Sequence, residues 1–195
     1  GIIDMVMSPD DPNTLYAAAW DRIRNYYQSL VSGQNARIWK TTDGGASWAK
    51  LGNGLPQNNK SRTGLTIDAK NAQHLIAMYA DSTLYFNGLY ETFNGGQAWK
   101  PMNPDTIDVK SFQGNFAWYF GKVFINPFNS NDLWALGVNT YRSLNGNVWT
   151  PTVGNVSDTH VDHHDMAFLS ATSFLIATDG GLYRSDDNAA SWQKI

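Results

Sequence analysis

The sequence has no cysteine, one glutamate (Glu91) and no cluster of basic residues. Without cysteine there are no disulfides and no thiolate metal sites, although this does not fix the compartment in which the protein works. A net charge of -3 without a basic patch argues against a nucleic-acid partner. No apolar run approaches the roughly 18 residues that a membrane-spanning helix needs, so we expect no membrane insertion.

Residues that favour helices are scarce as well, and no stretch carries an apolar stripe with helical spacing. The chain is instead rich in Gly, Asn, Ser, Thr and Asp, and it contains 8 Trp, 9 Tyr and 9 Phe. So many aromatic residues can bury enough apolar surface to offset the entropy of ordering, which excludes a disordered chain. The composition predicts an all-β protein with many short strands joined by tight turns.

One short motif, called a box below, occurs four times along the chain. The first box, Thr41–Trp48, reads TTDGGASW, and the second, Thr92–Trp99, reads TFNGGQAW. The third, Ser143–Trp149 (SLNGNVW), is one residue shorter, and the fourth, Ser185–Trp192, reads SDDNAASW. The closing tryptophans lie 51, 50 and 43 residues apart, a period typical of the blades of a β-propeller.

The residue types of a box suit a hairpin turn between two strands. Asp or Asn before Gly favours a turn with positive φ, and its side chain can accept hydrogen bonds from backbone N–H groups of that turn. The Ser or Thr hydroxyl can add another hydrogen bond, and the Trp offers a large apolar surface for packing between neighbouring sheets. We therefore predict structural roles for Thr41, Asp43, Gly45, Trp48, Thr92, Asn94, Gly96, Trp99, Ser143, Asn145, Trp149, Ser185, Asp187 and Trp192.

Three strand-like stretches precede each box and a short one follows it. In the first unit the preceding stretches are Met5–Pro9, Leu15–Ala17 and Ile38–Lys40. Four strands with such a turn make one propeller blade. The sequence thus predicts an all-β propeller with four four-stranded blades, at about residues 1–54, 62–103, 120–153 and 163–195.

The boxes resemble the BNR or Asp-box repeat, Ser/Thr-x-Asp-x-Gly-x-x-Trp, of sialidases, xyloglucan-hydrolysing glycosidases, sortilin-type receptors and secreted bacterial proteins. The first box matches in full, the second has Asn94 in place of Asp, and the fourth has Asn188 and Ala189 where glycine is expected. The resemblance looks strongest to the sortilin-like bacterial branch, and it implies a bacterial propeller that is secreted or displayed at the cell surface. Because such propellers commonly close with about six to eight blades or more, residues 1–195 are expected to be a single partial propeller, completed by the remaining blades of the same polypeptide.

Propellers usually bind ligands through loops at one end, and the loop over residues 20–35 is unusually long. Trp, Tyr and Arg are good recognition anchors. The candidate binding residues of this loop are Trp20, Arg22, Arg24, Tyr26 and Tyr27. A loop packed on itself, with Asp21 paired to Arg22 and Tyr26 covering a sheet edge, explains the same residues.

A second candidate segment, Phe112–Phe120, contains Trp118 and Tyr119 near Asn and Gln side chains. Its rings are suited to stacking on a sugar whose hydroxyls the amides would hydrogen-bond. Apolar packing at a junction between blades accounts for the segment as well.

The third candidate is the His-rich stretch His160–Asp165. In an extended strand, His160, Asp162 and His164 would share one face, where two imidazoles and a carboxylate are suited to bind zinc or another divalent metal. Histidines hydrogen-bonded along an axial channel explain the same pattern. No other cofactor is expected.

The sequence carries no recognisable catalytic set, so the first functional hypothesis is a module that binds a glycan or a protein. The second is a xyloglucanase-like glycoside hydrolase fragment, which needs two carboxylates about 5–10 Å apart. The residues available for such a pair are Asp81, Asp105, Asp108, Asp158, Asp162 and Asp165. The third is a protein-assembly scaffold. A sialidase is least expected, because the single glutamate, Glu91, precedes a box in a strand, where we predict an exposed structural role.

Overall fold

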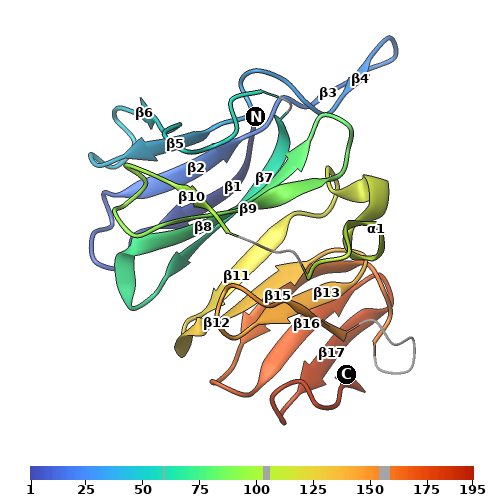
Figure 1. The fold of residues 1–195 in the computed structure, drawn as a ribbon. Helices are drawn as coiled ribbons and strands as arrows, with labels where there is room; N and C mark the ends of the chain where they lie inside the picture. The colour runs from blue at the N-terminus through green and yellow to red at the C-terminus, as the bar shows by residue number, and fades with distance from the viewer. Residues whose placement is uncertain (59, 103–105, 154–158) are drawn as a thin grey trace.

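Figure 1 shows the computed structural model, which describes residues 1–58, 60–102, 106–153 and 159–195. Its strands form four four-stranded antiparallel sheets and one separate two-stranded hairpin. Strands that follow one another along the chain are neighbours in each large sheet, except that the hairpin is inserted into the first sheet between β2 and β5. The prediction of an all-β chain with four four-stranded units is therefore confirmed.

The first sheet contains β1 (Ile2–Met7), β2 (Leu15–Ala19), β5 (Ile38–Thr41) and β6 (Ala49–Lys50). The second contains β7 (Lys60–Asp68), β8 (Asn71–Asp81), β9 (Phe86–Thr92) and β10 (Lys100–Pro101). The third contains β11 (Lys122–Asn126), β12 (Asn129–Leu136), β13 (Thr140–Ser143) and β14 (Thr150–Val153). The fourth contains β15 (His163–Phe168), β16 (Phe174–Thr178), β17 (Gly181–Ser185) and β18 (Gln193–Lys194). The separate hairpin consists of β3 (Ile23–Arg24) and β4 (Ser29–Leu30).

Each box forms the turn between the third and fourth strands of its sheet. In the first box, Asp43 Oδ1 accepts a hydrogen bond from Ser47 N at 2.9 Å, and the Thr41 hydroxyl accepts a second backbone N–H. The other boxes repeat both bonds with their own hydroxyl and Asp or Asn side chains. All four turns contain residues with positive φ, and in the fourth these are Asn188 at 63° and Ala189 at 68°, in place of glycine.

The sheets pack on one another in chain order, from the blue first sheet to the red fourth sheet in Figure 1. An apolar core lies at each of the three junctions between them. Trp99 packs in the core between the first and second sheets, Trp149 in the next core and Trp192 in the last. Each of these three box indoles is therefore wedged against the preceding sheet.

The two outermost sheets leave apolar side chains uncovered. Met5 and Met7 of the first sheet are 56% and 55% exposed, and Leu169, which follows β15 of the fourth sheet, is 47% exposed. Trp48 of the first box is 39% exposed, because no sheet in the described part of the chain precedes its own. Trp48 therefore lacks the packing against a preceding sheet that the other three box tryptophans have within the described residues.

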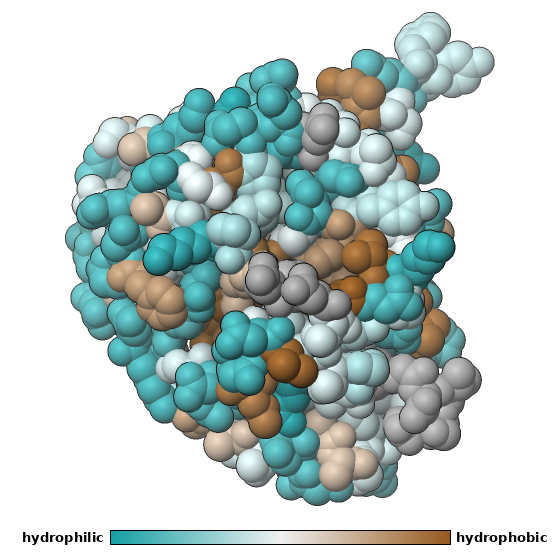
Figure 2. Space-filling view, viewed as in Figure 1, coloured by the Kyte–Doolittle hydropathy of each residue, from teal (hydrophilic) through white to brown (hydrophobic). Residues whose placement is uncertain are grey.

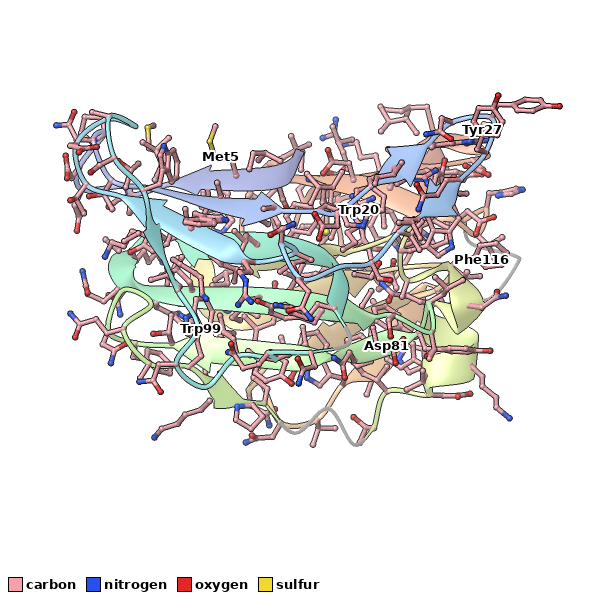
Figure 3. All side chains as sticks on the ribbon, turned by 90° about the horizontal axis from the view of Figure 1, so that it is seen from above. Met5, Trp20, Tyr27, Asp81, Trp99 and Phe116 are labelled. Carbon is pink, nitrogen blue, oxygen red and sulfur yellow. The ribbon has the colours of Figure 1, made fainter. Side chains whose placement is uncertain are left out.

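The loops at the end opposite the boxes join the second and third strands of a sheet, or one sheet to the next. The β3–β4 hairpin belongs to this end and stands away from the body of the molecule at the upper right of Figures 1 and 2. The connection from the second to the third sheet contains α1 (Val109–Phe112) and η1 (Gly114–Phe116). In Figure 3, Tyr27 and Phe116 lie at this end and Trp99 lies toward the box end. Within the described ranges, no helix has the length and apolar character to cross a membrane.

Candidate functional site

The end opposite the boxes carries a cluster of arginine and aromatic side chains, centred on Trp20, Arg22 and Arg62. Trp20 follows β2 and Arg22 precedes β3, whereas Arg62 lies in β7 of the second sheet. The guanidinium carbons of Arg22 and Arg62 lie 5.7 Å and 6.0 Å from the centre of the Trp20 ring. Such cation–π contacts are stabilising, and the contact of Arg62 with Trp20 holds the long loop of the first sheet against the second sheet.

Two further aromatic residues reach this cluster from the connection between the second and third sheets. The Arg22 guanidinium carbon lies 5.4 Å from the centre of the Trp118 ring, and Tyr119 O accepts a hydrogen bond from Arg62. Tyr119 is 51% exposed, so its ring is part of the surface. The structure thus brings together candidate residues from two separate segments, and we call Trp20, Arg22, Arg62, Trp118 and Tyr119 the loop-end cluster.

Arg62 is the member of the loop-end cluster that sequence reasoning missed. Burial lowers the pKa of its guanidinium below the usual value, and the charge of Asp4 opposes this shift. Its Nε is buried without a hydrogen-bond partner among the described residues. A buried hydrogen-bond donor without a partner destabilises the fold, and such donors are more common at functional sites than elsewhere. No sequence signal marks Arg62, because a single arginine in a strand is ordinarily a surface residue.

The other candidates of the first loop lie on the β3–β4 hairpin, outside the loop-end cluster. Tyr26 and Tyr27 form its tip, where they are 94% and 92% exposed and contact each other edge to face with ring centres 5.1 Å apart. Arg24 is an exposed residue of β3. The alternative in which Tyr26 covers a sheet edge is therefore wrong.

Arg22 links this hairpin to the loop-end cluster. Its guanidinium donates a hydrogen bond to Leu30 O in β4 at 3.2 Å. The Asp21 carboxylate does not pair with it as the packed-loop alternative expects, but accepts a hydrogen bond from Asn35 N at 2.7 Å. Asp21 therefore closes the base of the long loop, and Arg22 remains available to the aromatic rings.

The His-rich stretch departs from the predicted extended strand. β15 begins only at His163, and Asp162 has a φ of 65°, so His160, Asp162 and His164 do not alternate along one strand. His160 Nδ1 lies 2.9 Å from the carbonyl oxygen of the next residue, and His164 Nε2 lies 2.6 Å from Asp179 Oδ1. In the part of the chain that the structure describes, no three His, Cys, Asp or Glu side chains are grouped to hold a metal.

Two histidines of this stretch have distinct surroundings. The His164 ring lies beside the loop-end cluster, with its centre 5.6 Å from that of Tyr119. His163 is buried, and its ring nitrogens lie 3.1 Å from Thr159 Oγ1 and 3.1 Å from Val138 O. Burial lowers the pKa of His163 to about 4, so this imidazole is neutral at physiological pH.

The carboxylates considered for glycoside hydrolysis lie in separate elements: Asp81 ends β8, Asp108 precedes α1 and Asp165 lies in β15. Asp81, Asp108 and Asp165 each accept a hydrogen bond from a backbone N–H one or two residues later, at 2.8–3.0 Å. Asp108 thereby caps the N-terminus of α1. Asp105 and Asp158 lie outside the described residues. These side-chain contacts give Asp81, Asp108 and Asp165 local structural roles.

A second group of charged residues lies at the box end, between the second and third sheets. His74 is 5% exposed, and its Nδ1 lies 3.1 Å from Asp68 Oδ2 while its Nε2 lies 3.1 Å from Glu91 Oε1. The Phe93 ring stacks on the imidazole, with centres 4.4 Å apart and planes 13° apart. The prediction of an exposed structural role for Glu91 is wrong, because its side chain is only 28% exposed and pairs with a buried histidine.

The electrostatics of this group favour a protonated imidazole. Burial alone would lower the pKa of His74, but its hydrogen bonds to Glu91 and Asp68, together with the charges of both carboxylates, raise it above the usual value. Burial acts to raise the pKa of Asp68, yet hydrogen bonds from Lys70 N, Ser130 and His74 hold it below the usual value. The group opens on a cleft of about 480 Å³ between the two sheets.

No protein-family model matches the sequence, and the comparison with curated proteins gave no match. An ancestral GH74 enzyme is similar in structure, with a TM-score of 0.67 and 13% identity over 100% of this chain and 25% of that enzyme. A GH74 enzyme from Niastella koreensis gives a TM-score of 0.51 and 16% identity over 97% of this chain and 35% of that enzyme. The chain thus spans about a quarter to a third of these enzymes, and the likeness shows a fold of the β-propeller class.

Proposed function

We propose that this chain is a run of four consecutive Asp-box blades of a larger β-propeller, which binds a glycan or protein partner through the loop-end cluster. The main support for this proposal is that the residues of the loop-end cluster meet at one end of the sheets, although they come from three separate segments of the chain. Trp, Tyr and Arg dominate the binding energy of many protein interfaces. Aromatic rings with nearby donors also suit the faces and hydroxyls of sugars.

Binding is better supported than glycoside hydrolysis. A hydrolase needs one carboxylate free to move a proton and a second carboxylate about 5–10 Å away. Asp81 and Asp108 instead accept backbone N–H groups in their own turns. The likeness to GH74 enzymes supports the hydrolase alternative at the level of fold only.

The proposal of a partial propeller rests on the uncovered outer faces. Met5, Met7 and Trp48 are exposed on the first sheet, where a preceding blade would pack. In this chain Trp48→Ala should cost less than about 1 kcal/mol of unfolding free energy, whereas Trp99→Ala should cost about 3–5 kcal/mol. In a longer polypeptide that adds the neighbouring blades, the cost of Trp48→Ala should rise toward that of Trp99→Ala. An unchanged, small cost there would refute the partial propeller.

A glycan array combined with a reducing-sugar assay tests the function. Retention of a glycan without release of reducing ends supports a binding module, and turnover supports the hydrolase. Tyr119→Ala, at an exposed position of the loop-end cluster, should weaken retention about tenfold. Phe128→Ala, at an exposed position in the turn after β11 at the box end, should leave it unchanged.

If no glycan is retained and no reducing ends are released, the remaining hypothesis is a protein partner, which includes a role in protein assembly. Cross-linking through a photoreactive residue in place of Tyr27 would then identify the partner, and Tyr119→Ala should reduce the yield of that cross-link. A yield that is unchanged in Tyr119→Ala would place the partner elsewhere on the surface. A secreted or cell-surface location is part of the same proposal; it rests on the sequence resemblance and is tested by cell fractionation.

A further inference from the structure

The residue immediately before the box occupies the same strand position in all four sheets: Lys40, Glu91, Arg142 and Arg184. At the first junction between sheets, this residue is a cation that reaches the next box. Lys40 Nζ donates a hydrogen bond to Gly95 O at 3.0 Å and lies 5.1 Å from the centre of the Tyr16 ring in its own sheet. Lys40 therefore ties the first sheet to the second.

The junction between the third and fourth sheets repeats this arrangement. Arg142 Nη1 donates to Asn188 O at 3.0 Å, and its guanidinium carbon lies 4.7 Å from the centre of the Trp134 ring. Trp134 pairs with Arg142 in register, as Tyr16 pairs with Lys40. Two of the three junctions are thus closed by a cation that lies over an aromatic ring and donates to a box carbonyl.

The junction between the second and third sheets lacks both parts of this cation–aromatic pair. Glu91 stands at the position of the cation, and its register partner is Ile76 where the other two sheets have an aromatic ring. A carboxylate cannot donate to the next box. The chain therefore supplies no cation from this position to close the junction.

The third box also lacks the residue that would accept such a cation. In each of the other boxes, one residue donates its backbone N–H at 2.8–3.0 Å to a backbone carbonyl oxygen near the start of the second strand. These residues are Gly44, Gly95 and Asn188. The next residue donates to the box hydroxyl, as Gly146 N does in the third box at 2.9 Å. The residue missing from the third box is therefore the counterpart of Gly95 and Asn188, whose carbonyl oxygens accept from the cations.

The cleft of about 480 Å³ lies where these two departures coincide, and it is lined by Asp68, His74, Glu91, Phe93, Asn131 and Gly146 among others. This volume falls within the roughly 300–1,000 Å³ of typical ligand sites. Phe93 is 62% exposed although its ring stacks on His74, so much of the ring remains available. The cleft therefore presents an aromatic ring beside a carboxylate, a pairing suited to a cation.

The charge of the group also suits a cation. Two carboxylates flank one imidazole, which leaves the group with a net negative charge even when His74 is protonated. Among the described residues, only His74 hydrogen-bonds the Glu91 carboxylate. Lys70 lines the cleft as well, but its ammonium group donates to Phe128 O at 2.6 Å.

We propose that this cleft binds the ammonium or guanidinium group of a basic side chain from a partner polypeptide. The group takes the place that Lys40 and Arg142 fill at the other two junctions, with the Glu91 carboxylate as its counter-charge and the Phe93 ring beside it. The partner thus supplies, at this junction, the cation that the chain itself supplies at the other two junctions. This site lies at the end opposite the loop-end cluster and does not depend on the function proposed for that cluster.

An NMR titration with N-acetyl-arginine amide, and with the uncharged N-acetyl-citrulline amide of matched shape, tests the proposal. The arginine probe should shift the resonances of Phe93 and His74 saturably and bind at least about tenfold more tightly than the citrulline probe. Glu91→Gln, which removes the charge, should weaken arginine binding about tenfold. Asp10→Asn, which removes an exposed carboxylate outside the cleft, should leave it unchanged, and so should Tyr119→Ala.

A second variant, Phe93→Leu, is useful if Glu91→Gln disturbs the pairing with His74. It removes the exposed aromatic ring of Phe93 without opening a cavity in the core. This variant should weaken arginine binding severalfold while the spectrum stays well dispersed. Equal affinity for the two probes would overturn the proposal. So would shifts of the Phe93 resonances by a neutral oligosaccharide such as cellotetraose without any shift by the arginine probe.

Discussion

The junction between the third and fourth sheets and the junction between the second and third sheets use the same strand positions with opposite charges. In the third sheet Asp132 is central: it accepts a hydrogen bond from Asn126 Nδ2 at 2.7 Å and one from Arg142 Nε at 2.6 Å. In the second sheet a histidine is central and a carboxylate lies on each side, 3.1 Å away. The corresponding residues there are Asp68, His74 and Glu91.

This difference decides whether a junction is closed by the chain itself. Asp132 orients Arg142 so that the guanidinium crosses to Asn188 in the fourth sheet. His74 instead satisfies Glu91 within the second sheet, so neither residue crosses to the third. An apolar core holds the sheets together at both junctions. The residue before the box can therefore be a cation, as Arg142 is, or an anion, as Glu91 is, without loss of the fold. Where it is an anion, a cleft lies between the two sheets.

The largest effect is expected from Asp132→Ala. It should lower the free energy of unfolding by about 3–5 kcal/mol, because Arg142 would keep a buried charge without its partner. The Asp132 side chain is 1% exposed and that of Arg142 is 11% exposed. Denaturant unfolding measures the change, and the double variant Asp132→Ala/Arg142→Met should recover part of it. A loss below about 1 kcal/mol, the range of a surface pair, would show that this junction does not depend on the ion pair.

A smaller, pH-dependent effect is expected from His74→Gln. The raised pKa of His74 means that its charged hydrogen bonds stabilise the fold below pH 6.5, and that this contribution is lost as the pH rises through the folded-state pKa. The variant should therefore be about 2 kcal/mol less stable than the parent at pH values just below 6.5, and the difference should shrink at high pH. Unfolding curves across a pH series measure this. His163 titrates in both proteins and cancels in the difference, so a gap that stays constant with pH would contradict the account.

The smallest effect is expected from Lys40→Met, at the junction between the first and second sheets. This variant keeps most of the side-chain volume and removes one cation–π contact and one hydrogen bond, so it should cost about 1 kcal/mol. Lys50→Met is a matched control, because Lys50 is exposed in the neighbouring strand. Thermal unfolding of both variants gives the comparison. Equal costs would mean that Lys40 does not help to close its junction.

The fold could be predicted from the sequence because similar turn-forming residues and the same closing tryptophan recur in each box. Gly and Asn after the box hydroxyl predict the turns, and the recurring tryptophans predict sheets that pack on one another. The four sheets confirm this, although Trp48 is uncovered. The repeat does not show whether a box indole packs on the preceding or the following sheet, so the pattern could not reveal that Trp48, rather than Trp192, is the uncovered one.

The sites could be predicted only in part, because they depend on contacts between segments far apart in the chain. Trp20 and Trp118 were predicted as separate candidates, but Arg62 joins them from within a strand whose pattern is ordinary. The alternation expected around Asp162 fails because its φ is positive, which periodicity alone cannot foresee. Glu91 did leave a signal: it is the one acidic residue at a position that is otherwise Lys or Arg.

An NMR titration of the four imidazoles tests most directly whether the second junction holds a histidine between two carboxylates. In one experiment, His74 should titrate above 6.5, whereas His163 should titrate at about 4 because burial without a carboxylate disfavours its charge. In Glu91→Gln the pKa of His74 should fall and that of His163 should not change. A pKa of His74 at or below 6.5 that does not change in Glu91→Gln would contradict this arrangement.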